Sequence, residues 1–164
     1  MPIEIRDADL GEPRDAAAVV EIVNAYARDP FGGGKPLPSD VRARLVPGLR
    51  AHPTTLVVLA WDAGRPVGVA VCFWGFSTFQ GRPLVNVHDL AVLPEHRGKG
   101  VGRALLAGVE ERARARDCCK LTLEVLDENA RARGLYASFG FTDGPFASAT
   151  STRFLTKPLP GGDR

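Results

Sequence analysis

The chain has no apolar run that could cross a bilayer as a helix, which takes about 20 residues. Residues 1–6 also lack the cationic, apolar and small-residue sections of a secretory signal. We therefore expect a cytoplasmic protein without a membrane partner.

Cysteine is scarce, and Cys72, Cys118 and Cys119 form an odd count without the spacing of a metal site. We expect reduced thiols that pack as small apolar side chains, and no bound metal. A strained disulfide within the adjacent pair, or metal capture by it, is the less favoured alternative.

The chain has almost no excess of one charge, because 21 basic and 19 acidic residues leave a formal net charge of +2. The basic run around Arg114 alternates with alanine and forms no broad basic face, so we expect no nucleic-acid partner. Internal repeats and linker-like segments are missing as well. With 164 residues, 45% of them apolar, the sequence predicts one domain over residues 1–164.

Apolar periodicity predicts seven strands and four helices. The expected strands are residues 3–7, 54–62, 65–76, 85–92, 120–125, 141–143 and 152–157. Two helices are expected at residues 100–116 and 128–139, and another carries Val19 and Ile22. A further helix is expected to be capped by Ser39 and ended or kinked by Pro47. Hairpins pair antiparallel and a strand–helix–strand crossover pairs parallel, so the sheet should be mixed.

Three glycines between a predicted strand and a predicted helix form the most informative motif. Gly98, Gly100 and Gly102 follow the strand at residues 85–92. Glycine has no Cβ, so its backbone can turn tightly and bring N–H groups against a ligand, and the next helix points its positive end at the same place. The pattern predicts a cradle for a phosphate group, and the alternative is a glycine-rich connection with exposed basic residues.

Spacing separates the nucleotide-binding motifs that use glycine turns. A triphosphate-binding loop requires Lys followed by Ser or Thr, but Lys99 is followed by Gly100. A dinucleotide-binding turn requires Gly-x-Gly-x-x-Gly after the first strand of a doubly wound sheet, whereas this turn follows the fourth predicted strand with different spacing. Neither motif fits.

The segment from Arg97 to Gly102 resembles the pyrophosphate loop of the GNAT family of N-acetyltransferases, whose signature is Arg/Gln-x-x-Gly-x-Gly/Ala. The likeness extends over residues 85–141 and includes Asn129, followed seven residues later by Tyr136 and then by a Gly-Phe pair. The resemblance implies an α/β (α+β) fold, with a mixed central β-sheet of about seven strands flanked by about four helices, as the predicted elements allow. It also implies acetyl-coenzyme A as cosubstrate.

The resemblance implies that main-chain groups hold most of this cosubstrate. The residues concerned are Leu90, Ala91, Val92, Arg97, Gly98, Lys99, Gly100, Val101, Gly102, Arg103, Asn129 and Tyr136. The strand end would face the pantetheine arm, with an amide near Val92 polarising the thioester carbonyl. The glycine turn would hold the pyrophosphate, with charge added by Lys99 and Arg103. Apolar packing of the strand and a helix cap at Asn129 are the alternative roles.

Two residues are candidates for proton transfer. The resemblance implies that Tyr136 donates a proton to the departing thiolate, and a core aromatic residue is its alternative. A protonated amine has a pKa near 10 and must lose a proton before it attacks. Histidine titrates near neutral pH, so His88 is the candidate base, directly or through water, with Glu124 in reserve. A hydrogen-bonded core histidine is the equal alternative.

The acceptor side resembles the diamine and thialysine acetyltransferase branch of the family over residues 77–89. That branch carries an acidic residue followed by Asp, whereas this chain has His88-Asp89, which weakens its attraction for a polycation. Asp89, Trp74 and Phe76 are the expected acceptor-binding residues, beside walls from residues 31–38 and 75–83. The aromatic residues could equally pack a homodimer interface.

The sequence thus predicts an N-acetyltransferase that moves acetyl from acetyl-coenzyme A to a primary amine of a small molecule, either a polyamine or amino-acid-like. Direct attack in a ternary complex is expected, since no cysteine lies in a nucleophile motif. Two alternatives stay open. One is transfer to a protein N-terminus or lysine, and the other is a non-catalytic module that senses acyl-coenzyme A.

Overall fold

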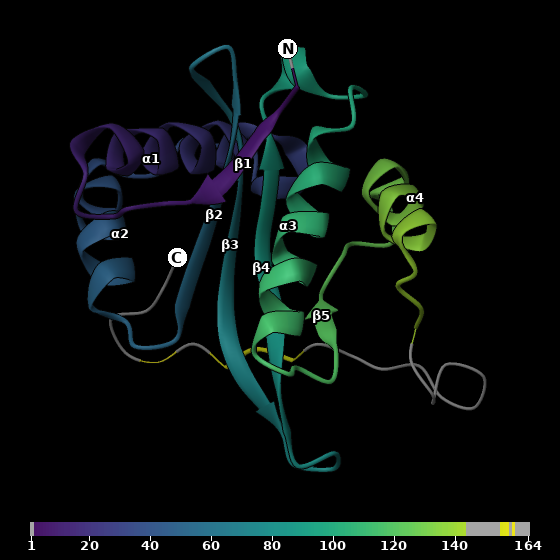
Figure 1. Cartoon of the computed structure of the whole chain (residues 1–164). Helices are drawn as coiled ribbons and strands as arrows, with labels where there is room; N and C mark the ends of the chain where they lie inside the picture. Colours follow the sequence, from purple (N-terminus) through teal and green to yellow (C-terminus); the bar gives the residue numbers. More distant parts are fainter. Residues whose placement is uncertain (1, 144–154, 158, 160–164) are drawn as a thin grey trace.

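A computed structural model describes residues 2–143, 155–157 and 159 of the chain (Figure 1). Among them, five strands form one central sheet. In order across the sheet these are β1 (Glu4–Asp7), β2 (Thr55–Asp62), β3 (Arg65–Ser77), β4 (Arg82–Val92) and β5 (Leu121–Leu123). The first three pairings are antiparallel and β4 pairs parallel to β5, which confirms the predicted mixed sheet.

The described residues form four α-helices and two short 3-10 helices. The α-helices are α1 (Pro13–Arg28), α2 (Ser39–Ala51), α3 (Val101–Ala115) and α4 (Ala130–Phe139), and the 3-10 helices are η1 (Pro30–Gly32) and η2 (Pro94–His96). In Figure 1, α3 lies in front of the sheet and α4 stands beside β5. None of the described helices is both long enough and apolar enough to cross a membrane.

The described residues contain five strands where the sequence predicted seven. Residues 141–143 form no strand, because Gly140 ends α4 in the left-handed conformation and Phe141 packs back against the ring of Tyr136, with centroids 5.8 Å apart. Of the predicted strand 152–157, residues 155–157 are exposed and form no strand. Residues 152–154 lie outside the described residues.

Helix α2 differs from its prediction at two prolines. Pro38 is the N-cap and Ser39 is the first helical residue, without a capping hydrogen bond from a side chain. Pro47 lies inside the helix, which continues to Ala51, so of the two predicted effects of Pro47, an end or a kink, the end is wrong. Proline removes one helix hydrogen bond, but Val46 and Leu49 are both buried in the core beside α1, and their packing holds the last turn.

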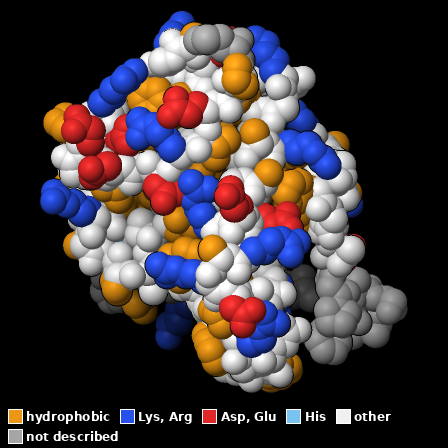
Figure 2. Space-filling model, in the orientation of Figure 1, with side chains coloured by type: hydrophobic (Ala, Val, Ile, Leu, Met, Phe, Trp, Pro, Cys, Tyr) orange, Lys and Arg blue, Asp and Glu red, His pale blue; other side chains and the backbone are white. Residues whose placement is uncertain are grey.

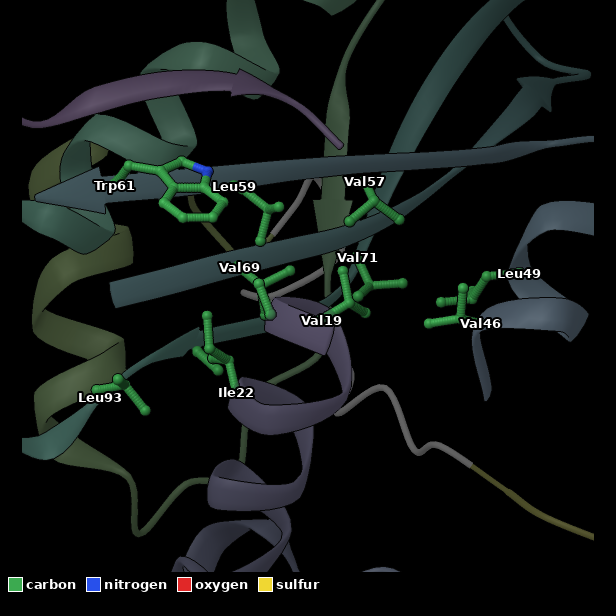
Figure 3. Close-up of a cluster of buried hydrophobic side chains, with 12 residues drawn as sticks. Val19, Ile22, Val46, Leu49, Val57, Leu59, Trp61, Val69, Val71 and Leu93 are labelled. Carbon is green, nitrogen blue, oxygen red and sulfur yellow. The ribbon is translucent and has the colours of Figure 1, made fainter. Parts of the chain in front are cut away.

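Side chains of β2 and β3 alternate between two hydrophobic cores, one on each face of the sheet. On one face, α1 and α2 pack against Val57, Leu59, Trp61, Val69 and Val71 (Figure 3). On the other face, α3 packs against Val58, Ala60, Val67, Ala70 and Cys72. The alternation of period two buries both faces, as expected for a sheet between helix layers, and it shifts by one residue at Val67, the extra residue of a β-bulge opposite Ala60 and Trp61.

Strand β4 contains an irregularity that shapes the site. Val87 pairs with Cys72 and Asp89 pairs with Val71, so His88 is the extra residue of a β-bulge. The parallel pairing with β5 ends at Val87, opposite Leu123. Beyond the bulge, β4 therefore continues to Val92 without β5 beside it.

Candidate active site

A cavity of about 590 Å³ opens where β4 and β5 separate. Its walls come from the end of β4, the segment after β5, the last turn of α1, the first turn of α3 and one side of α4 along most of its length. Its lining includes Leu90, Ala91, Val92, Arg97, Gly98, Gly100, Val101, Gly102, Arg103, Asn129 and Tyr136. The fold thus brings together every predicted cofactor-binding residue except Lys99, which is exposed outside the lining.

The glycine turn forms the wall of the cavity at the start of α3. Gly98 and Gly100 have φ angles of 73° and 83°, a left-handed region that other residues rarely adopt, and no atom lies within 4 Å of a Cβ placed on either. Gly100 is also the N-cap of α3, and no side chain caps the helix. The first N–H groups of α3 therefore point at open space with no partner within the helix, which fits an anion.

Gly102 is required for a different reason. A Cβ at this position would lie 3.0 Å from a methyl carbon of Leu135 in α4. This close approach brings α4, and with it Tyr136, against the start of α3. The third glycine of the motif thus serves the packing of two helices.

The edge of β4 forms a second wall. Leu90, Ala91 and Val92 pair with β3 on one side only, and β5 has already ended on the other. Alternate N–H and C=O groups of these residues therefore point into the cavity, as they do along any sheet edge. Such an edge can pair with an extended amide-containing ligand.

Two tyrosines line the cavity from opposite sides of the sheet. Burial raises the pKa of Tyr136 to about 12, and the negative charges of Tyr26 and Asp89 contribute to the rise. Burial also raises the pKa of Tyr26, with contributions from Asp89 and Asp29. Both phenols therefore keep their protons at neutral pH, which is the state that a proton donor needs. No sequence motif marks Tyr26.

His88 and Asp89 lie at the bulge, and their side chains do not line the cavity. His88 is exposed and meets the ring of Phe73 edge-on, with centroids 5.5 Å apart, so the alternative of a core histidine is wrong. Asp89 is half-buried, and burial raises the pKa of its carboxyl while His88 opposes the rise. Neither residue is among those lining the cavity, whereas Glu124 is.

Comparison with known proteins identifies the family. The model of the acetyltransferase (GNAT) family matches residues 19–141, which span the glycine turn, the end of β4 and Tyr136. The chain belongs to this family. Its sequence is 39% identical over 77 residues to thialysine N-epsilon-acetyltransferase of Bos taurus, a match that covers 47% of this chain and 45% of that protein. The chain therefore aligns with less than half the length of this curated relative.

Two further similarities cover more of the chain. An uncharacterized N-acetyltransferase of Bacillus subtilis, YhfO, is 29% identical over 129 residues, which are 79% of this chain and 85% of that protein. A possible acetyltransferase from Clostridium difficile 630 has a similar structure, with a TM-score of 0.77, 18% identity, and coverage of 97% of this chain and 99% of that chain. The structural similarity shows that the two proteins share a fold.

Three predicted residues of this GNAT family member keep side-chain partners of their own. Asn129 accepts a hydrogen bond from the N–H of Ala132 at 3.2 Å, so its role as a helix cap is confirmed, and it also lines the cavity. Arg103 donates to Ser138 Oγ at 3.2 Å. Arg97 donates from Nε to the carbonyl of Val92 at 3.0 Å.

The predicted aromatic acceptor residues lie away from the cavity. Trp74 packs under the guanidinium of Arg116, 4.0 Å from its ring centroid, and lines a separate pocket of about 550 Å³. Phe76 is 62% exposed on the β3–β4 hairpin, which projects beyond the rest of the sheet in Figure 1. Neither ring lines the GNAT cavity, because Trp74 and Phe76 pair with Val85 and Pro83 at the start of β4, whereas the cavity lies at its end. Their role in acceptor binding stays a prediction.

The cavity is lined instead by residues from the end of α1, from η1 and from the residue between them. Tyr26, Asp29 and Phe31 line the cavity, as do Arg131 and Leu135 of α4. Of the predicted wall at residues 31–38, only Phe31 reaches the lining. Contacts between elements distant in sequence create this wall, so no local motif could reveal it.

Charges around the cavity have both signs. Arg97, Arg103 and Arg131 line it together with Asp29 and Glu124. On the face shown in Figure 2, basic and acidic side chains are likewise interspersed. Within the described part of the chain, no group of three or more His, Cys, Asp or Glu residues is placed to hold a metal ion.

Proposed function

We propose that the protein is an N-acetyltransferase that transfers acetyl from acetyl-coenzyme A to a primary amine of a small molecule by direct attack in a ternary complex. One observation carries the proposal: the open N-terminus of α3 and the half-buried phenol of Tyr136 face the same cavity between β4 and β5. Membership of the GNAT family supports the same reaction class.

The cavity suits the donor in both charge and shape. The N–H groups at the start of α3, with Gly98 and Gly100, would bind the pyrophosphate, and the side chain of Arg103 would add positive charge. The free edge from Leu90 to Val92 would pair with the amide groups of the pantetheine arm. Bound there, acetyl-coenzyme A supplies the acetyl group as an activated thioester.

Tyr136 would donate its proton to the departing sulfur. Its raised pKa means that the phenol is fully protonated at neutral pH and holds its proton until charge develops on the leaving group. An incoming ammonium must lose a proton first. His88, Glu124 or water are the candidate bases, and the position of Glu124 on the cavity wall supports a role for it.

The acceptor is proposed to be a small cationic amine. Asp89, half-buried beside the cavity, and Glu124 on its wall would attract an ammonium group. The bovine relative carries thialysine in its name, and thialysine has such a group. Transfer to a protein N-terminus or lysine is the second candidate, because the same chemistry serves an amine on a peptide.

A screen with acetyl-coenzyme A tests the proposal. The amines are thialysine, lysine, spermidine and putrescine, alongside peptides with a free N-terminus or an internal lysine, and mass spectrometry detects acetylated products. A thiol reagent is a poor readout because Cys118 and Cys119 are partly exposed and free. Tyr136→Phe serves as the low-turnover control.

Each outcome separates the candidates. Acetylation of a small amine that depends on Tyr136 supports the proposal. Products from peptides alone favour the protein-modifying candidate. Tight binding of acetyl-coenzyme A without transfer to any amine or peptide in the screen would point to an acyl-coenzyme A sensor and overturn the proposal.

A further inference from the structure

The side chain of Arg97 links the glycine turn to the opposite wall of the cavity. Its Nε donates to the carbonyl of Val92 at the end of β4, at 3.0 Å. Its Nη2 lies 3.0 Å from Oδ2 of Asp29, the residue that follows α1. The side chains are 24% and 12% exposed, so the ion pair is shielded from water and screened less than a surface pair.

Asp29 in turn organises the segment that forms this wall. Its Oδ1 accepts the N–H of Phe31 at 3.0 Å, and its carbonyl accepts the N–H groups of Gly32 and Gly34 at 2.8 and 3.0 Å. The hydrogen bond from Phe31 and the charge of Arg97 lower the pKa of the Asp29 carboxyl, so the carboxylate is ionised at neutral pH. One charged residue therefore fixes the turn that begins η1.

The turn is packed closely against the end of α1. A Cβ on Gly32 would lie 1.9 Å from the carbonyl oxygen of Tyr26, so the backbone has no freedom to shift inward. Tyr26, Asp29 and Phe31 all line the cavity. Any displacement of Asp29 would therefore move the wall that faces the acceptor.

We infer that Arg97 is a positioning residue for the acceptor wall, and that its side chain is not a ligand of the coenzyme A pyrophosphate. The guanidinium donates a hydrogen bond to the carbonyl of Val92 and forms an ion pair with Asp29. The main chain of the glycine turn remains open to the phosphate. Arg97 thereby couples the placement of the acceptor to the loop that binds the donor. The kinetic part of this inference rests on the proposed function.

The test uses Arg97→Gln, Asp29→Asn and the double variant. We expect each single variant to raise KM for the amine about tenfold, because a shielded charge-assisted contact is lost. The double variant should stay within about twofold of either single variant, since both remove the same interaction. Calorimetric Kd for acetyl-coenzyme A should change by less than about threefold, a small loss for a group outside the phosphate site.

Hydrogen exchange supplies a readout that does not depend on turnover. The amides of Phe31, Gly32 and Gly34 should exchange faster in Arg97→Gln than in the unmodified protein, while amides within α3 stay unchanged. The matched control is Asp40–Arg44 on α2, an exposed pair 2.9 Å apart. Asp40→Asn and Arg44→Gln should change neither KM nor exchange at residues 31–34.

Two results would overturn the inference. One is a loss of acetyl-coenzyme A affinity of about tenfold or more in Arg97→Gln with unchanged affinity in Asp29→Asn, which would make Arg97 a phosphate ligand. The other is unchanged exchange at residues 31–34 in Arg97→Gln. If no amine is acetylated by the unmodified protein, the proposed function fails, and the exchange and calorimetry still decide the role of Arg97.

Discussion

Tyr26 of α1 and Tyr136 of α4 line one cavity from opposite faces of the sheet, and the negative charge that Tyr26 gains on ionisation helps to raise the pKa of Tyr136. Burial is the larger cause, and together they bring this pKa to about 12. Both half-buried phenols have raised pKa values and therefore stay neutral at working pH. Only Tyr136 belongs to the Asn-to-Tyr spacing shared with the family, so their roles can be separated by mutation.

Replacing Tyr136 with Phe removes the proposed proton donor and leaves the ring in place. We expect kcat to fall about 100-fold, the usual loss for one general acid, with Kd for acetyl-coenzyme A unchanged. Because the phenol ionises only near pH 12, the unmodified enzyme should show no loss of kcat from this group between about pH 8 and pH 10. Steady-state kinetics on the best amine of the screen gives both quantities.

Tyr26→Phe is the matched control, since it removes a hydroxyl from the facing wall of the same cavity. Its effect should appear in KM for the amine, with kcat within about threefold of the unmodified enzyme. Normal turnover by Tyr136→Phe would show that the assigned acid is wrong. A fall in kcat for Tyr26→Phe as large as for Tyr136→Phe would assign the acid to the pair.

Two substitutions of Gly100 distinguish the effect of charge on acetyl-coenzyme A affinity from the effect of backbone strain. Gly100→Glu and Gly100→Lys both force a side chain into the left-handed conformation, at about 1 to 2 kcal/mol, and open space surrounds the new Cβ. Glu places a negative charge at the N-terminus of α3, where the pyrophosphate is proposed to bind, whereas Lys places a positive one. We expect Glu to raise Kd for acetyl-coenzyme A by about 100-fold or more and Lys to raise it less than about tenfold, by calorimetry.

Thermal unfolding of the two Gly100 variants provides the control. Their midpoints should agree within a few degrees, because the backbone penalty is the same. Equal loss of binding by Glu and Lys would mean that the geometry of the turn, and no phosphate charge, controls affinity there.

The glycine turn and its helix could be predicted because both depend on local backbone properties. Positive φ at Gly98 and Gly100 and the start of α3 at Val101 follow from residues that are close together in the sequence. The cap at Asn129 is equally local. Sequence reasoning therefore located the wall of the cavity that we propose binds the donor.

The acceptor side depends on contacts that the sequence does not display. Tyr26 and Asp29 come from α1 and the turn after it, and Asp29 forms its ion pair with Arg97, which is far away in the sequence. The bulge at His88 appears only in the pairing with β3, and it changes which side chains face the cavity. Trp74 and Phe76 were predicted at the acceptor site because the glycine-bearing segment 75–83 was expected beside the functional end of the sheet, but this hairpin lies at the start of β4, away from the cavity.

Asp15 is a buried charged residue whose ionisation we expect to stabilise the folded protein. It is 1% exposed, receives two hydrogen bonds from the guanidinium of Arg6 at 2.6 and 2.7 Å, and accepts the N–H of Asp9 at 2.9 Å. The hydrogen bonds from Arg6 are the main reason that the pKa of Asp15 lies below its ordinary value. Its carboxylate is therefore more stable in the folded chain than in the unfolded chain.

Asp15→Asn should lower the free energy of unfolding by about 2 kcal/mol at pH 7, since it leaves the partly exposed guanidinium of Arg6 facing a neutral partner at a buried position. A lowered folded pKa contributes stability above the unfolded value of about 3.9, and this contribution is lost as pH falls through the folded pKa. The difference between the two proteins should therefore shrink below about pH 4. Urea unfolding across about pH 2 to 7 measures it, with the exposed Asp40→Asn as a control that changes stability by less than about 0.5 kcal/mol. A difference that stayed constant down to about pH 2 would show that packing of the introduced amide, and not the lost charge of Asp15, accounts for the change.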